Sequence, residues 1–78
     1  MTNIEKFTAV LTRHYSELFD SDPDYGYSKG RLTPMALAKI MADGLRTGSA
    51  NKDGKGIKRT CKELGIKYTY TEIKEFLK

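Results

Sequence analysis

Few side chains in this 78-residue chain are of the kinds that do acid–base, nucleophilic or metal chemistry. It holds one histidine, His14, and one cysteine, Cys61. His14 falls between Leu11 and Leu18 on the apolar side of an expected helix, which predicts a hydrogen-bonded structural imidazole. Cys61 falls on the apolar side of another expected helix, where a thiol acts as a small core side chain. We expect neither to be catalytic, and the sequence predicts no enzyme.

Two short stretches begin like ligand-binding loops and then depart from the pattern. Aspartates alternate over 20–24 as in a calcium loop, but Tyr25 stands where that loop needs glycine and Arg31 where it needs a bidentate glutamate. An ordinary acidic turn is the better interpretation. The stretch 48–56 is rich in glycine and lysine, but its spacing differs from the Walker phosphate loop and no Ser or Thr follows Lys55. The sequence therefore predicts no metal site and no cofactor.

Positive charge is concentrated in the centre of the sequence. The chain has a net charge of +4; residues 46–67 hold seven basic and two acidic residues, whereas residues 1–24 hold two basic and five acidic ones. Such a basic stretch is typical of a surface that meets phosphates or an acidic protein, although a face kept charged for solubility is the plain alternative. The predicted binding residues are Arg46, Lys52, Lys55, Lys58, Arg59 and Lys62, with Tyr25 and Tyr27 as anchors for a protein partner.

Four helices are expected to position these side chains, over about 3–19, 34–46, 55–64 and 70–78. Their starts carry capping signals, which are Thr2 with Glu5, Thr33 with Pro34, and Thr69 with Glu72. Gly65 suits a left-handed helix end, followed by the apolar Ile66. The pattern predicts an all-α fold, a small single-domain bundle over 1–78 that ends in a helix-turn-helix-like pair.

Apolar spacing predicts which side chains form the core. The expected set is Ile4, Phe7, Val10, Leu11, His14, Tyr15, Leu18 and Phe19, then Leu37, Ile40, Met41, Gly44 and Leu45, then Ile57, Cys61 and Leu64, and finally Tyr70, Ile73, Phe76 and Leu77. Gly44 is expected to let another helix approach closely. The last helix is neutral and carries two carboxylates, which argues against base-specific reading of a DNA groove by that helix.

Composition narrows the class of protein further. Hydrophobic residues make up 38% of the chain, and no apolar run approaches the ~18 residues that a membrane span needs. The first residues also lack the basic and apolar regions of a signal peptide. We therefore expect a cytoplasmic protein that does not enter a membrane. Because a chain of this length builds a small core, a homodimer is a further possibility.

The stretch 33–78, above all SANKDGKGIKRTCKELGIKYTY at 49–70, resembles small helical proteins encoded by bacteriophages and prophages. Some of these are anti-CRISPR or other anti-defence inhibitors. The resemblance implies a phage origin and the cytoplasm of a bacterial host, and it assigns no role to any residue. The leading prediction is a non-enzymatic binding module that engages nucleic acid, or an acidic or nucleic-acid-binding host protein, through its basic central face. The alternative is an anti-CRISPR-like inhibitor that binds a defence complex by protein–protein contact, and a purely structural or dimerisation module is the third class.

Overall fold

The computed structural model of the chain describes residues 1–21 and 32–78. It contains four helices: α1 (Asn3–Ser21), α2 (Pro34–Thr47), α3 (Lys55–Leu64) and α4 (Tyr70–Leu77). All regular structure in these two ranges is helical. The expected all-α class is therefore confirmed, and the expected helix bounds differ from the observed ones by at most two residues.

The helix starts follow the capping signals of the sequence. The Thr2 N–H donates to Glu5 Oε1 at 2.9 Å and the Glu5 N–H donates to Thr2 Oγ1 at 3.2 Å, which is a complete capping box. Thr33 Oγ1 accepts a first-turn N–H of α2 at 3.1 Å. Thr69 Oγ1 accepts the Glu72 N–H at 3.2 Å, but the Thr69 N–H donates to a carbonyl of the preceding turn instead of to Glu72. The second expected capping box is thus only half formed.

The turn after α3 is the one that Gly65 predicts. Gly65 has a φ of +72°, its N–H donates to the Lys62 carbonyl at 3.4 Å, and the Ile66 N–H donates to the Cys61 carbonyl at 2.9 Å. These two bonds make a Schellman motif, which ends a helix on a residue with left-handed backbone. The chain can therefore leave α3 sharply and return towards the core with Ile66.

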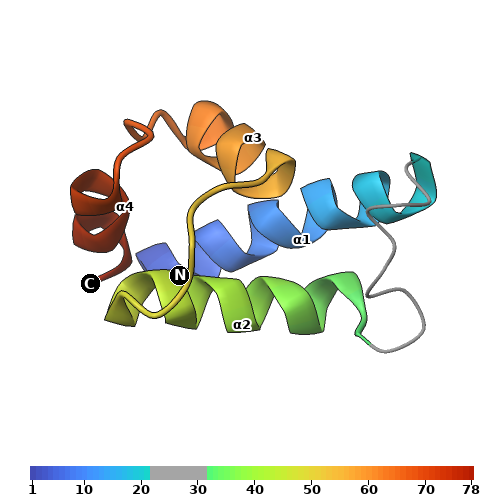
Figure 1. Cartoon of the computed structure of the whole chain (residues 1–78), viewed down its shortest axis with the longest axis horizontal. Coiled ribbons are helices and arrows are strands. Elements are labelled where there is room, and N and C mark those ends of the chain that lie inside the picture. Colours follow the sequence, from blue (N-terminus) through green and yellow to red (C-terminus); the bar gives the residue numbers. More distant parts are fainter. Residues whose placement is uncertain (22–31) are drawn as a thin grey trace.

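The other three helices are arranged around α1. Helices α1 and α2 lie side by side and antiparallel, α3 packs on α1, and α4 crosses one end of the pair (Figure 1). Helix α4 contacts both α2 and α1. The two helices joined by the Gly65 turn thus rest on α1 and α2 and make little contact with each other, so a helix-turn-helix role for them stays an interpretation.

The core is built mainly from one side of α1. Its buried residues are Phe7, Leu11, Tyr15, Leu18 and Phe19 from α1; Ala38, Ala42 and Leu45 from α2; Ile57 and Cys61 from α3; and Ile73 and Leu77 from α4. Most of the expected core is confirmed, including Cys61 as a small buried side chain. In α2 the buried side of the helix is rotated relative to the expected one. Small alanines face α1 and let the two helices approach closely. Ile40 lies nearly opposite Ala42 at about 100° per residue and is 55% exposed, so its predicted burial is wrong.

Two glycines mark places where the backbone comes close to a neighbour. A Cβ at Gly44 would lie 2.5 Å from the Cβ of Ala50, so the element that approaches Gly44 is the loop after α2 and not another helix as expected. A Cβ at Gly56 would overlap the Tyr15 ring, since it would lie 2.8 Å from Cδ1 and nearer still to Cε1. Helix α3 is therefore seated on α1 through a residue without a side chain.

Candidate nucleic-acid interface

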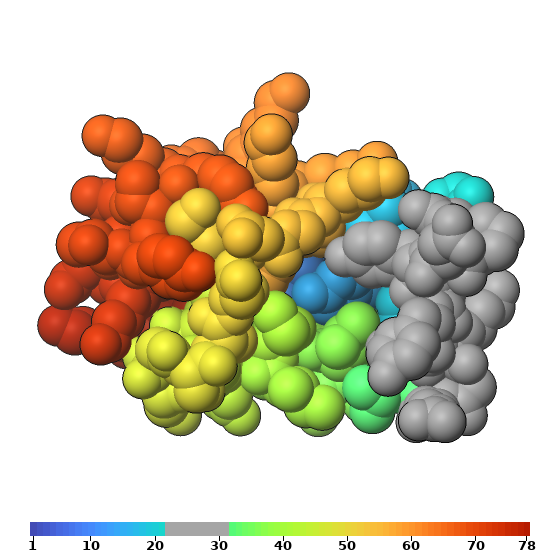
Figure 2. Space-filling view, in the orientation of Figure 1, coloured from blue at the N-terminus to red at the C-terminus, as the bar shows by residue number. Residues whose placement is uncertain are grey.

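The outer side of α3 carries a compact group of positive charges. We call this group the α3 basic face; its exposed members are Lys55, Lys58, Arg59 and Lys62. At about 100° per residue they fall within roughly 100° of arc, on the side away from the buried Ile57 and Cys61. In Figure 2 the segment that forms α3 lies along the upper edge of the molecule, where side chains project away from the body. Four of the eight predicted site residues are thus brought together.

The single acidic side chain of α3 is turned towards α1. Glu63 forms an ion pair with Arg13, and its Oε1 lies 3.1 Å from His14 Nε2. His14 is therefore the hydrogen-bonded imidazole that the sequence predicts. Its Nδ1 is buried and has no hydrogen-bond partner among the described residues. Because Glu63 is held by α1, the outward side of α3 presents cations alone.

Three of these cations are not neutralised by any residue in the ranges that the structure describes. Among the ion pairs formed by residues 1–21 and 32–78, none involves Lys58, Arg59 or Lys62. The charges of these three side chains are exposed to solvent over about one and a half turns of α3. An array of this kind attracts phosphates, because each contact with a phosphate releases a condensed counterion.

Lys52 was predicted to join this surface, but the structure gives it a different setting. Its ammonium lies 4.1 Å from the centre of the Tyr68 ring, 5.3 Å from the centre of the Tyr70 ring and 3.8 Å from Asp53 Oδ1, and its side chain is 21% exposed. Cation–π contacts of this kind hold a lysine in place. Lys52 therefore joins the loop before α3 to the segment after it.

Hydrogen bonds from the two tyrosines complete this clamp, which we name the Lys52 clamp after its central residue. The Tyr68 hydroxyl donates to the Lys52 carbonyl at 2.8 Å. The Tyr70 hydroxyl donates to Asn51 Oδ1 at 3.1 Å and accepts the Lys52 N–H at 3.3 Å. Partial burial raises the pKa of the Tyr68 hydroxyl, and the negative charge of Asp53 adds to this shift. The clamp fixes the start of α3 relative to α4.

Tyr70 is the functional candidate that sequence reasoning missed. It was expected in the core because it matches the apolar spacing of α4, but it is 49% exposed, so that prediction is wrong. Its hydroxyl is held by Asn51 and the Lys52 backbone, and the Lys52 ammonium lies 5.3 Å from the centre of its ring. The signal that was available is the amphipathic nature of tyrosine, which often presents a ring at the surface while its hydroxyl is bonded.

The remaining predicted residues do not join the α3 basic face. Arg46 is exposed on α2 and lies 3.5 Å from Asp43 Oδ1, one turn back along the same helix. Tyr25 and Tyr27, predicted as protein anchors, lie outside the described residues. So do Asp22 and Asp24 of the calcium-like pattern.

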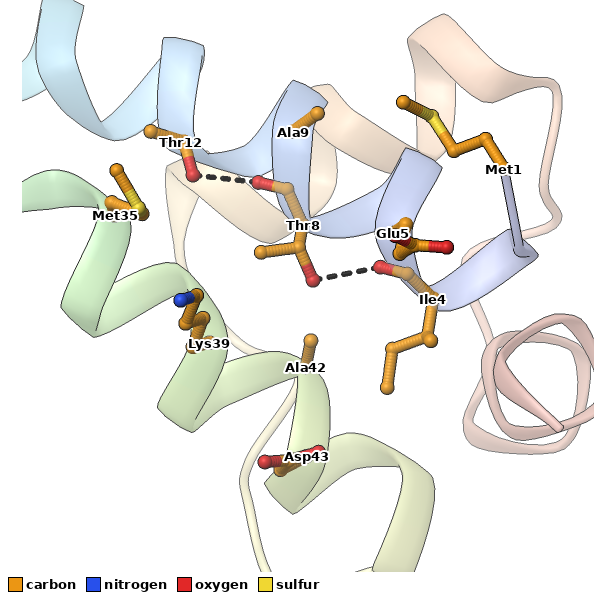
Figure 3. A pocket seen from close by; sticks show the side chains of 10 residues that line it. All are labelled: Met1, Ile4, Glu5, Thr8, Ala9, Thr12, Met35, Lys39, Ala42 and Asp43. Atoms are coloured by element: carbon orange, nitrogen blue, oxygen red, sulfur yellow. Dashed lines mark hydrogen bonds between the residues drawn. The ribbon is translucent and has the colours of Figure 1, made fainter.

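A second surface feature is an apolar groove between α1 and α2 (Figure 3). It encloses about 600 Å³, and we call it the α1–α2 groove. The hydroxyls of Thr8 and Thr12 donate to carbonyls one turn earlier at 2.7 Å, so they are satisfied within α1. The side chains that line the groove are Met1, Ile4, Glu5, Thr8, Ala9, Thr12, Met35, Lys39, Ala42 and Asp43. Sequence analysis did not single out this surface, because it depends on how α1 and α2 pair.

Neither a cluster of metal-binding side chains nor a membrane-spanning helix is present among the described residues. Within 1–21 and 32–78 there is no group of three or more His, Cys, Asp or Glu side chains that could hold a metal. Burial raises the pKa of the Cys61 thiol, which disfavours the thiolate that metals and electrophiles require. No helix in the same ranges is both long enough and apolar enough to cross a lipid bilayer.

Comparison with known proteins adds no relative to this picture. No family model matches the chain. No curated protein and no solved structure shows significant similarity to it either. The interpretation of the surface therefore rests on its own chemistry.

Proposed function

We propose that this protein is a non-enzymatic module that binds nucleic acid through the α3 basic face. The observation that carries the proposal is the outward array of Lys55, Lys58, Arg59 and Lys62 on a helix whose only carboxylate is held by α1. Such an array binds phosphates without reading bases. Action in the cytoplasm of a bacterial host, and a phage origin, belong to the same proposal.

The two carboxylates of α4 favour contact with the backbone of the nucleic acid over sequence-specific reading by that helix. Glu72 and Glu75 are exposed on this helix, where they would repel phosphates beside a DNA groove. Binding through α3 should therefore be of modest affinity, tolerant of sequence and strongly dependent on salt.

Fluorescence anisotropy with a labelled oligonucleotide at a series of salt concentrations tests this proposal. Lys58→Ala, Arg59→Ala and Lys62→Ala should each weaken binding and lower the slope of log affinity against log salt by about one, since each removes roughly one phosphate contact. Lys6→Ala is the matched control, because it removes the same charge from an exposed position on α1. Glu63→Gln should strengthen binding, because it removes the one carboxylate of α3.

Two results would contradict the proposal. Absence of binding even at low salt would exclude a nucleic-acid partner for this surface. An equal loss from Lys6→Ala and from the α3 substitutions would show that net charge, and not the α3 basic face, determines the affinity.

The α1–α2 groove favours a second candidate function, an inhibitor that acts by protein–protein contact. Met1 and Met35 are exposed at this groove, and methionine side chains adapt well to apolar partners. The carboxylates of Glu5 and Asp43 at the groove suit an amphipathic partner helix with basic residues beside its apolar side. Ala9→Arg would fill the groove from an exposed position of α1. This candidate requires a partner that stays bound after nuclease treatment of a bacterial lysate and is lost with Ala9→Arg.

A further inference from the structure

The ring of Tyr70 is an exposed aromatic surface that the protein holds in a fixed position. About half of the residue is exposed, yet its hydroxyl makes two hydrogen bonds, to Asn51 Oδ1 at 3.1 Å and from the Lys52 N–H at 3.3 Å. The Lys52 ammonium lies 5.3 Å from the ring centre. A ring restrained in this way loses little conformational entropy when a ligand packs against it.

Tyr70 also lines a cavity whose walls carry an aromatic ring, an apolar side chain, a hydroxyl and an ammonium group. The cavity measures about 370 Å³ and is bounded by Tyr70, Leu45, Gly48, Thr71 and Lys74. This volume lies at the lower end of small-ligand pockets, which span about 300–1000 Å³. An aromatic ring and Leu45 suit the flat face of a base, the Thr71 hydroxyl suits its polar edge, and the Lys74 ammonium suits a phosphate.

The position of this cavity connects it with the α3 basic face. Lys52, in contact with the Tyr70 ring, lies three residues before the start of α3. Lys67 is exposed in the short turn that leads from α3 to Tyr70. Positive side chains therefore occur before, within and after the turn that joins α3 to α4, at Lys62, Lys67 and Lys74, and all three are exposed.

We propose that Tyr70 stacks on an unpaired base, so that the preferred ligand is single-stranded nucleic acid. The inference rests on the proposed function and names the substrate class of that surface. In a duplex each base is stacked on its neighbours and its faces are covered, whereas a single strand can turn a base onto an aromatic side chain. Phosphate contacts on α3 give affinity for any nucleic acid, and Tyr70 adds affinity for the unpaired form alone.

The test compares a labelled oligothymidylate of about twelve nucleotides, within the usual 4–16-nucleotide range of single-strand sites, with a duplex carrying the same number of phosphates. Tyr70→Ala should weaken binding of the single strand by roughly 5- to 150-fold, as expected from the loss of one stacked base, and should leave duplex binding unchanged. Tyr70→Phe keeps the ring and should retain most of the affinity. An oligonucleotide of abasic residues keeps the phosphates, and for it Tyr70→Ala should have no effect.

The outcomes separate this inference from the proposed function. If single strand and duplex bind equally and Tyr70→Ala is silent while Arg59→Ala still weakens binding, stacking is wrong and phosphate binding stands. If neither form binds at low salt, the proposed function itself fails. A loss from Tyr70→Phe as large as that from Tyr70→Ala, or an equal loss for abasic and normal strands, also overturns stacking. A thermal melt of each variant checks that the Lys52 clamp and the fold persist.

Discussion

Replacing Gly56 with alanine tests the seating of α3 on α1. Alanine favours a helix over glycine by about 1 kcal/mol, so the local effect is stabilising. The new Cβ, however, would overlap the ring of the buried Tyr15, and ordinary contact requires the ring or α3 to move by well over half an ångström. Overpacking of a core costs about 1–3 kcal/mol, and an overlap with two ring atoms belongs to the upper part of that range. The net expectation is a loss of about 1–2 kcal/mol in unfolding free energy.

Thermal and urea denaturation followed by circular dichroism measure this loss. For a domain of this size it corresponds to a fall of roughly 5–15 °C in melting temperature. The same substitution in a Tyr15→Leu background should be neutral or stabilising, because the overlapping ring atoms are gone. A Gly56→Ala protein with an unchanged or higher melting temperature would refute the close seating of α3, because helix propensity would then be the only effect left.

Two further predictions concern the ends and the interior of α3. Gly65→Ala should lower the free energy of unfolding by about 1 kcal/mol, because Gly65 has a φ of +72°. A Cβ at this position would meet no neighbour, so the cost is backbone strain alone. A melting curve that overlays that of the wild type would contradict this prediction. Burial raises the pKa of the Cys61 thiol above its ordinary value of 9.0, so the native state keeps this proton to higher pH than the unfolded chain does. The contribution of Cys61 to the free energy of unfolding is therefore complete below pH 9.0 and is lost as pH rises through the raised pKa. Cys61→Ala should flatten this alkaline decline, measured by urea denaturation at a series of pH values. Equal slopes of unfolding free energy against pH for the two proteins would show that the thiol does not contribute.

Features that depend on neighbouring residues in the sequence were predicted well. The caps at Thr2 and Thr33 and the left-handed turn at Gly65 each follow from side-chain or backbone chemistry within six residues. The broad apolar side of α1 was also clear, because long amphipathic helices give a strong periodic signal. Together these signals were sufficient for the helix order and for the α3 basic face, which lies on one helix.

Features that depend on pairing between distant segments were not predictable. The burial of α2 was misjudged at Ile40 because the alanines Ala38 and Ala42 face α1, and small residues give a weak hydropathy signal. The contact of Glu63 with Arg13 joins residues fifty positions apart, and the Lys52 clamp joins the loop before α3 to the turn after it. The fixed position of the Tyr70 ring follows from that clamp, whereas the sequence signalled only that a tyrosine can present its ring at the surface.

The position of α4 has a consequence for how the protein folds during synthesis. The rings of Phe7 and Phe76 lie 6.4 Å apart, and Ile73 and Leu77 of α4 are buried in the same cluster as the first turns of α1. Because α1 precedes α4 in the sequence, α1 leaves the ribosome before the residues that cover its Phe7 end. The Phe7 end of α1 therefore stays uncovered until α4 emerges, and this part of the core waits for a contact between segments far apart in the sequence.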